Sequence, residues 1–197
     1  MSPFERRLVI AADRFIFWLT DHWLCVFGTA VFLFLALAFA SPYLIAHGHE
    51  RLGGLIFSAY HRVCHQLPER SFFVFGHQVA YCQRDVGVYA GIVCGGILYS
   101  LSRRRLALRS LRWYLVAFVT PVAFDGITQL FGLRQSNWYL RLGTGLWLGV
   151  GTALLVYPII ATAMAQTHGE LEERFGPGLG RLRRPHRPVS EEDTDGG

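Results

Sequence analysis

The residues best suited to chemistry lie in two short stretches that both contain cysteine and arginine. The first is Cys-His-Gln-Leu-Pro-Glu-Arg-Ser, which begins at Cys64. The second is Cys-Gln-Arg-Asp, in which Cys82 precedes Asp85 by three positions. Thiolate, imidazole and carboxylate groups are the ligands that zinc prefers in proteins. One hypothesis is therefore a zinc site with four ligands: Cys64, His65, Cys82 and Asp85.

A zinc ion with mixed ligands and one open position activates water for hydrolysis. Asp125, which lies within an apolar run, is the candidate catalytic proton acceptor. An ionisable residue at such a place is costly unless it is paired, which makes it a functional-site hypothesis. The structural alternatives for Asp125 are a salt bridge to Arg84 or Arg141 and a hydrogen bond to Gln129.

The same two cysteines allow a redox interpretation. If Cys64 and Cys82 face an oxidising compartment, they form a structural disulfide or a thiol–disulfide relay that uses a membrane quinone. A Cys-x-x-Cys motif, which is typical of catalytic thiol pairs, is absent from the sequence. Cys25 and Cys94 lie within apolar runs, where we expect them to serve as packing residues.

A third hypothesis rests on the arginines, because a guanidinium group binds phosphate and carboxylate with two parallel hydrogen bonds. It is an anion or lipid-headgroup site, with an anionic or lipid-linked substrate, formed by Arg70, Arg84, Arg134 and Arg141. Four polar residues would support any of these sites: Gln66, Gln129, Ser136 and Asn137. A subunit of a larger membrane complex is the remaining alternative.

The elements that must position these residues are transmembrane helices. Of the 197 residues, 52% are hydrophobic and 17% are charged, which is apolar for a soluble domain. Crossing a bilayer takes about 20 apolar residues. Four runs approach or exceed that length: 24–45, 86–101, 113–133 and 142–165. We therefore expect an all-α integral membrane protein with four transmembrane helices.

Arginines set the expected orientation, since basic residues concentrate on the cytoplasmic side of a membrane. They cluster before the first apolar run, between the second and third, and after the fourth. Both termini should therefore be cytoplasmic, in the cytoplasmic membrane (the inner membrane of a bacterium), with loops 46–78 and 134–138 outside. Topology and contact with membrane lipids account for the net charge of +5, so no nucleic-acid partner is expected.

The domain boundaries follow from the same patterns. Residues 1–23 have the spacing of an amphipathic helix at the cytoplasmic face, 24–166 form the transmembrane domain, and 167–197 are a polar, disordered tail. In the outer loop, residues 55–63 are predicted as a short helix. The second transmembrane helix should begin near Val79.

Glycines recur at every fourth position in two of the expected membrane helices. They are Gly87, Gly91 and Gly95 in one helix, and Gly145 and Gly149, followed by Ala153, in another. Stripes of small residues let helices approach closely, so we expect these two helices to pack on each other.

Four motifs in a fixed order resemble a known family. They are C-H-Q-x-P-x-R-S, C-x-R-D-x-G-x-Y-x-G, D-G-x-x-Q and R-x-S-N-x-x-x-R-x-x-T-G. Between about Tyr60 and Gly149 the sequence is similar to domain-of-unknown-function family 2085, small predicted membrane proteins of bacteria and archaea. Asp85 stands where many members have a second cysteine. The resemblance implies a membrane fold and leaves the activity to be argued from the residues.

Overall fold

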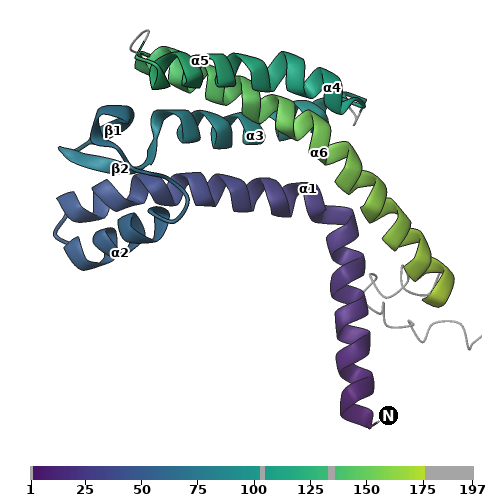
Figure 1. Cartoon of the computed structure of the whole chain (residues 1–197). Coiled ribbons are helices and arrows are strands. Elements are labelled where there is room, and N and C mark those ends of the chain that lie inside the picture. The colour runs from purple at the N-terminus through teal and green to yellow at the C-terminus, as the bar shows by residue number, and fades with distance from the viewer. Residues whose placement is uncertain (1, 103–104, 133–135, 176–197) are drawn as a thin grey trace, which may run out of the picture. The chain divides into compact units, whose positions relative to one another are not determined.

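The protein is mostly helical, with one small hairpin (Figure 1). The computed structural model describes residues 2–102, 105–132 and 136–175. The longer helices are α1 (Pro3–Ala46), α2 (Glu50–Tyr60), α3 (Gln83–Leu101), α5 (Thr120–Leu130) and α6 (Trp138–Phe175). The short elements are η1 (Pro68–Arg70), α4 (Leu111–Tyr114), the π-helical turn η2 (Leu115–Val119) and strands β1 (Ser71–Val74) and β2 (His77–Cys82).

Two of the described helices, α1 and α6, are long and apolar enough to cross a membrane. Their most apolar stretches have mean hydropathies of 2.4 and 1.8. The second and third apolar runs of the sequence also fall in helical segments, α3 and the α4–η2–α5 series, but neither meets the same test. Four transmembrane helices are therefore not confirmed, and the strands show that the fold is not purely α.

The described part of the chain divides into two compact units: residues 2–23 with 162–175, and the described residues between 24 and 161. In the first unit, His168 lies 3.0 Å from the Thr20 hydroxyl and stacks on Phe17. Residues 3–23 are the beginning of α1 and not a separate helix, and α6 extends through 167–175, where the sequence predicted a disordered tail. Glu170, Leu171 and Glu172 favour a helix by their propensities, which explains the extension. The rest of that predicted tail lies outside the described residues.

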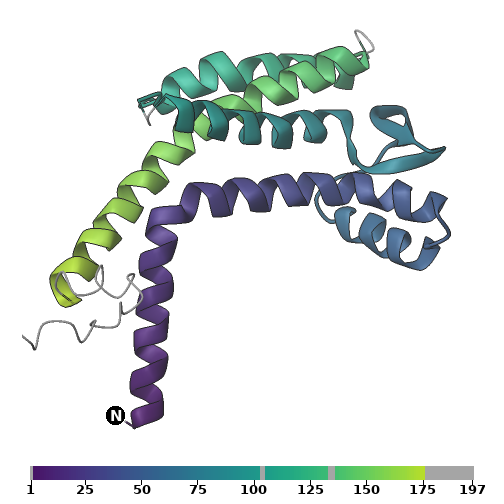
Figure 2. The same cartoon turned by 180° about the vertical axis from the view of Figure 1, so that it is seen from behind.

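In the second unit, α3 lies between α1 and α6 (Figure 2). The glycine stripes form the α3–α6 contact, as predicted. A Cβ added to Gly91 would lie 2.9 Å from the Cα of Gly149, and one added to Gly149 would lie 2.9 Å from the Cα of Gly91. The two backbones are thus in direct contact, which only residues without side chains permit.

Prolines in the apolar helices deprive main-chain carbonyls of their helical hydrogen-bond donors, and other segments supply donors instead. Pro121 has no N–H to offer the preceding turn, and the Ala117 carbonyl accepts a hydrogen bond of 2.8 Å from the Trp147 indole of α6. Pro158 likewise cannot donate to the Leu154 carbonyl. That carbonyl accepts a hydrogen bond of 2.9 Å from the main-chain N–H of Leu108. Both carbonyls therefore have partners although the surroundings are apolar.

The antiparallel hairpin β1–β2 is the element that the sequence did not predict. Its two-residue turn holds Phe75 at φ 54° and Gly76 at φ 78°, the backbone of a tight hairpin connection. Pairing with β1 keeps 79–82 extended, so the expectation that α3 begins near Val79 was wrong. Instead, α3 begins at Gln83.

The buried centre of this region is aromatic. Tyr60 from α2 and Tyr81 from β2 are almost fully buried and pack edge to face with a ring separation of 4.8 Å. Phe34 of α1 stacks on Tyr60 at 5.0 Å, and Cys64 belongs to the same cluster. The helix predicted at 55–63 is found a few residues earlier, as α2, and it carries Tyr60 into this core.

Candidate functional site

The loop that follows α2 is held against the hairpin by Gln66. Gln66 has a positive φ of 50°, and its side-chain amide donates to the carbonyls of Phe57 (2.8 Å) and Ala80 (3.0 Å). The main-chain carbonyl of Gln66 accepts a hydrogen bond of 2.7 Å from the side-chain amide of Gln78. These bonds place the neighbouring Cys64 against the end of β2.

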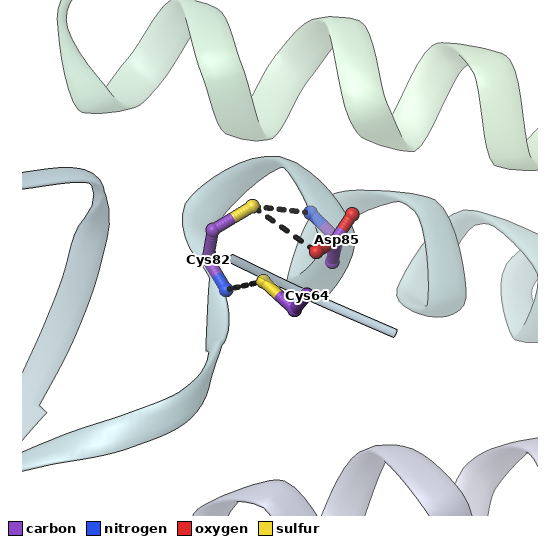
Figure 3. Close-up of side chains that lie close together, drawn as sticks. All are labelled: Cys64, Cys82 and Asp85. Carbon is purple, nitrogen blue, oxygen red and sulfur yellow. Dashed lines mark hydrogen bonds between the residues drawn. The ribbon is translucent and has the colours of Figure 1, made fainter. Parts of the chain in front are cut away.

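Cys64, Cys82 and Asp85 form one cluster (Figure 3). The Cys64 Sγ accepts a hydrogen bond of 3.2 Å from the main-chain N–H of Cys82. The Cys82 Sγ lies 3.2 Å from the Asp85 Oδ2 and accepts a 3.5 Å hydrogen bond from the Asp85 main-chain N–H. All three candidate ligand atoms lie within 4.8 Å of one another, and the two sulfurs are free thiols.

Cys82 is placed by two elements at once. It is the last residue of β2 and the N-cap of α3, with ψ 160°. The side chain of an N-cap residue accepts from a free N–H of the first helical turn, which is the bond to Asp85. Cys82 and Asp85 are therefore close because Cys82 caps the helix, and not because both lie on one helical face.

The two thiols differ in acidity. The hydrogen bond between them lowers the pKa of Cys82, and the Asp85 main-chain N–H lowers it further, against burial and the Asp85 carboxylate. The same thiol–thiol hydrogen bond, followed by burial, raises the pKa of Cys64 well above that of an ordinary thiol. Cys82 is thus the thiol that ionises first and Cys64 the one that keeps its proton.

His65 does not join the cluster. Its side chain is exposed, and its nitrogens are outside the group of mutually close ligand atoms. Consecutive residues of an irregular, non-helical segment need not point the same way, and here Cys64 is buried while His65 is not. His65 does line the cavity beside the cluster.

Asp125 is 1% exposed and forms an ion pair with Arg84 of α3. A salt bridge to Arg84 was one of the alternatives that the sequence predicted. The side-chain amide of Gln129, one turn further along α5, donates a hydrogen bond of 2.8 Å to the same carboxylate oxygen. Asp125 does not line the cavity. The geometry therefore gives no support to Asp125 as a proton acceptor and favours a role in positioning Arg84.

Arg141 of α6 reaches the same region. It donates to the main-chain carbonyl of Glu69 (3.1 Å) and to the side-chain carbonyls of Gln83 (3.3 Å) and Gln129 (3.5 Å). Gln83 is buried and also donates 3.2 Å to the Ser71 carbonyl, so it ties α3 to the hairpin and to Arg141. Sequence reasoning missed Gln83, although its place between Cys82 and Arg84 was a signal.

The remaining predicted residues are less central. Arg70 is exposed and lines the cavity, whereas Arg134 lies outside the described residues. The Asn137 side chain accepts 3.0 Å from the Leu140 N–H at the start of α6, which is a capping role. Ser136 is buried beside a second cavity.

The cluster opens on a cavity of about 350 Å³, lined by both cysteines, Asp85 and three arginines. A neighbouring cavity of about 520 Å³ shares Arg70, Gln129 and Arg141 with it. The arrangement therefore combines a thiol–carboxylate ligand set with guanidinium groups around one space.

Comparisons with known proteins found a matching family profile and similar archaeal proteins. The profile of the family described as "Predicted membrane protein (DUF2085)" matches residues 64–155, from the first cysteine of the cluster into α6. An uncharacterized protein of Methanocaldococcus jannaschii is 40% identical over 105 residues, which are 53% of this chain and 67% of the relative. One of Methanothermobacter thermautotrophicus is 38% identical over 93 residues, 47% of this chain and 83% of the relative. No solved structure matches.

Proposed function

The chain belongs to the DUF2085 family of predicted membrane proteins, and on that premise we propose that it is a metal-binding membrane protein with a zinc site at its polar cavity. The ligands in this proposal are the side chains of Cys64, Cys82 and Asp85. The observation that carries it is the mutual approach of their three ligand atoms within 4.8 Å.

The donor set suits zinc. Zinc binds thiolate at about 2.3 Å and carboxylate at about 2.0–2.2 Å, which separates tetrahedral ligands by about 3.5–3.8 Å. The cluster already approaches those separations, with 3.2 Å between the Cys82 Sγ and the Asp85 Oδ2. The lowered pKa of Cys82 favours its thiolate form, and metal binding would displace the proton of Cys64.

Three protein ligands would leave one position of a tetrahedral zinc ion open. Zinc held in this way would activate water and so supply hydrolytic chemistry. The chain contributes the surroundings: Arg84 lines the cavity, and Asp125 and Gln129 hold its guanidinium in place. Asp125 is thus proposed as a positioning residue and not as the general base.

The membrane placement is proposed from the arginine distribution. Four transmembrane helices, with both termini in the cytoplasm, would put the cavity in the outer half of the cytoplasmic membrane, next to lipid headgroups. The relatives named above come from archaea, so the proposal does not depend on a bacterial inner membrane.

Metal content of detergent-purified protein tests the proposal. We expect about one zinc per chain in the wild type. Cys82→Ser and Asp85→Ala should lose the metal, whereas Cys94→Ser, outside the cluster, should keep it. Metal-free wild-type protein with four titratable thiols would refute a metal site.

A second candidate is a redox thiol pair, which one observation favours: a cysteine of lowered pKa at a helix N-terminus beside a second thiol is typical of disulfide chemistry. Oxidation would join the two sulfurs and release two electrons and two protons to an acceptor such as a membrane quinone. Thiol counting separates the candidates, because metal-free protein with two titratable thiols, Cys25 and Cys94, supports this one.

A further inference from the structure

The cavity beside the cluster carries an excess of positive charge. Arg70, Arg84 and Arg141 line it, and Asp85 is the only carboxylate among the described lining residues. Asp125 pairs with Arg84, which leaves two arginines against one carboxylate. Arg70 and Arg141 also line the neighbouring cavity. A space of about 350 Å³ accommodates a small charged group.

Arg141 is bound by neutral oxygens. Its three described hydrogen bonds, of 3.1, 3.3 and 3.5 Å, end on amide and main-chain carbonyls. Within residues 2–102, 105–132 and 136–175, no carboxylate forms an ion pair with it. Long bonds to neutral acceptors hold a guanidinium in place without neutralising it.

Two buried donors of these arginines lack an acceptor. The Nε atoms of Arg84 and Arg141 are both buried and have no hydrogen-bond partner in the part of the chain that the structure describes. Buried N–H groups are normally satisfied, so both arginines are incompletely hydrogen-bonded. The terminal nitrogens of arginine form a fork that binds an oxyanion through two oxygens.

We propose that the cavity binds a phosphoryl oxyanion through Arg141, Arg84 and Arg70, next to the cysteine–aspartate cluster. A phosphoryl group offers three or four acceptor oxygens and up to two negative charges, which match several guanidinium groups better than a carboxylate does. The inference rests on the proposed function and names the substrate class of that site. The phosphoryl group is either free phosphate or part of a lipid headgroup.

Binding to the full-length protein, as purified, tests the inference. One arm titrates inorganic phosphate by calorimetry, and the other uses nanodiscs of phosphatidylcholine with and without phosphatidic acid. Saturable binding of inorganic phosphate indicates a free-phosphate site. Stabilisation by phosphatidic acid without phosphate binding indicates a headgroup site, and either result supports the proposal.

Matched variants assign the binding to the cavity. Arg141→Gln should weaken binding about tenfold or more, because one charge-assisted double hydrogen bond is lost. Arg141→Lys keeps the positive charge but lacks the two parallel donors of the guanidinium group. Its affinity for phosphate should lie between those of the wild type and Arg141→Gln. Arg51→Gln removes an exposed arginine outside both cavities and should bind like the wild type.

Three results would overturn the inference: no binding of either probe to the wild type, equal competition by acetate, or equal loss in Arg141→Gln and Arg51→Gln. If Arg141→Gln does not fold, the two binding measurements on the wild-type protein still test the inference. Zinc content measured on the same samples separates this inference from the metal proposal, because Arg141→Gln should retain zinc even where phosphate binding is lost.

Discussion

Residue by residue, the site depends on where its protons and charges reside. Cys82 and Cys64 are chemically alike, yet the hydrogen bond between them lowers the pKa of the first and raises that of the second. Asp125 and Arg84 lie on different helices and form an ion pair. Each relation can be tested by changing one partner and measuring the other.

The acidity of Cys82 should depend on the group at position 64. In metal-free protein lacking Cys25 and Cys94, the rate of Cys82 alkylation should reach half its maximum at a pH below about 8.5, the value for an ordinary thiol. A lowered pKa makes more thiolate at a given pH. Cys64→Ala removes the hydrogen-bond donor and should move the midpoint to higher pH, measured by mass spectrometry of the Cys82 peptide.

Cys64→Ser is the matched control, because its hydroxyl keeps a donor and should retain part of the shift. In the unsubstituted pair, Cys64 itself should be modified only at higher pH than Cys82. A Cys82 midpoint that does not move in Cys64→Ala would contradict the hydrogen bond as the cause.

Removal of the Asp125 carboxylate should destabilise the protein strongly. Asp125→Ala leaves the Arg84 charge unpaired and should lower the free energy of unfolding by about 3–5 kcal/mol. Asp125→Asn keeps hydrogen bonding to Arg84 and Gln129 and should cost less. Thermal unfolding in detergent, or denaturant titration, measures both.

The double variant Arg84→Met with Asp125→Leu removes both charges together. It should recover much of the stability that Asp125→Ala loses, since a buried ion pair replaced by apolar groups is often close to neutral. If the double variant is as unstable as Asp125→Ala, the loss comes from packing and not from an unpaired charge.

Among the contacts between elements, the α3–α6 contact tolerates substitution least, because glycines of each helix lie directly against the backbone of the other. A methyl group at Gly91 would lie 2.9 Å from the Gly149 Cα and still closer to the Leu146 carbonyl. No side-chain rotation relieves a clash with main-chain atoms, so one of the helices must move. The site depends on this contact because α3 carries Arg84 and α6 carries Arg141.

Gly91→Ala should therefore lower the free energy of unfolding by about 1–3 kcal/mol, the usual cost of overpacking. Gly28→Ala is the matched control in α1, where an added Cβ meets no atom within 4 Å. That change should be neutral or stabilising by up to about 1 kcal/mol, because alanine favours helix. Comparable losses of stability in both variants would mean that α3 and α6 do not pack through this stripe.

At the scale of the whole molecule, the prediction concerns orientation in the membrane. The apolar helices α1 and α6 and the membership in a family of predicted membrane proteins both indicate a membrane protein. The arginine-rich connection between α3 and α4 argues that this side is cytoplasmic and that the loop with α2 and the hairpin is outside.

Single-cysteine labelling in a chain without native cysteines should decide the orientation. His49→Cys, at an exposed position before α2, should react with a membrane-impermeant maleimide in intact cells. Arg105→Cys, exposed between α3 and α4, should react only after the membrane is opened. The opposite labelling pattern would reverse the topology and remove the site from the outer half of the membrane.

The sequence by itself determined what depends on local spacing and on the cost of burying charge. Apolar run lengths located the helical segments, glycines at every fourth position predicted the α3–α6 contact, and an acid within an apolar run required a partner, which is Arg84. The same patterns predicted four membrane crossings, which are not confirmed, since α3 and the α4–η2–α5 series do not pass the test that α1 and α6 pass.

Only the tertiary structure decided how the site is assembled. The hairpin turn uses Phe75 at positive φ, a conformation that an aromatic residue rarely adopts, so its sequence lacks the usual turn signal. Pairing of β2 with β1 then makes Cys82 a helix cap, and Gln66 bonds to Ala80 to bring Cys64 beside it. His65 is left exposed and Asp125 outside the cavity wall. These placements follow from contacts between segments distant in the chain, which spacing within any one segment does not encode.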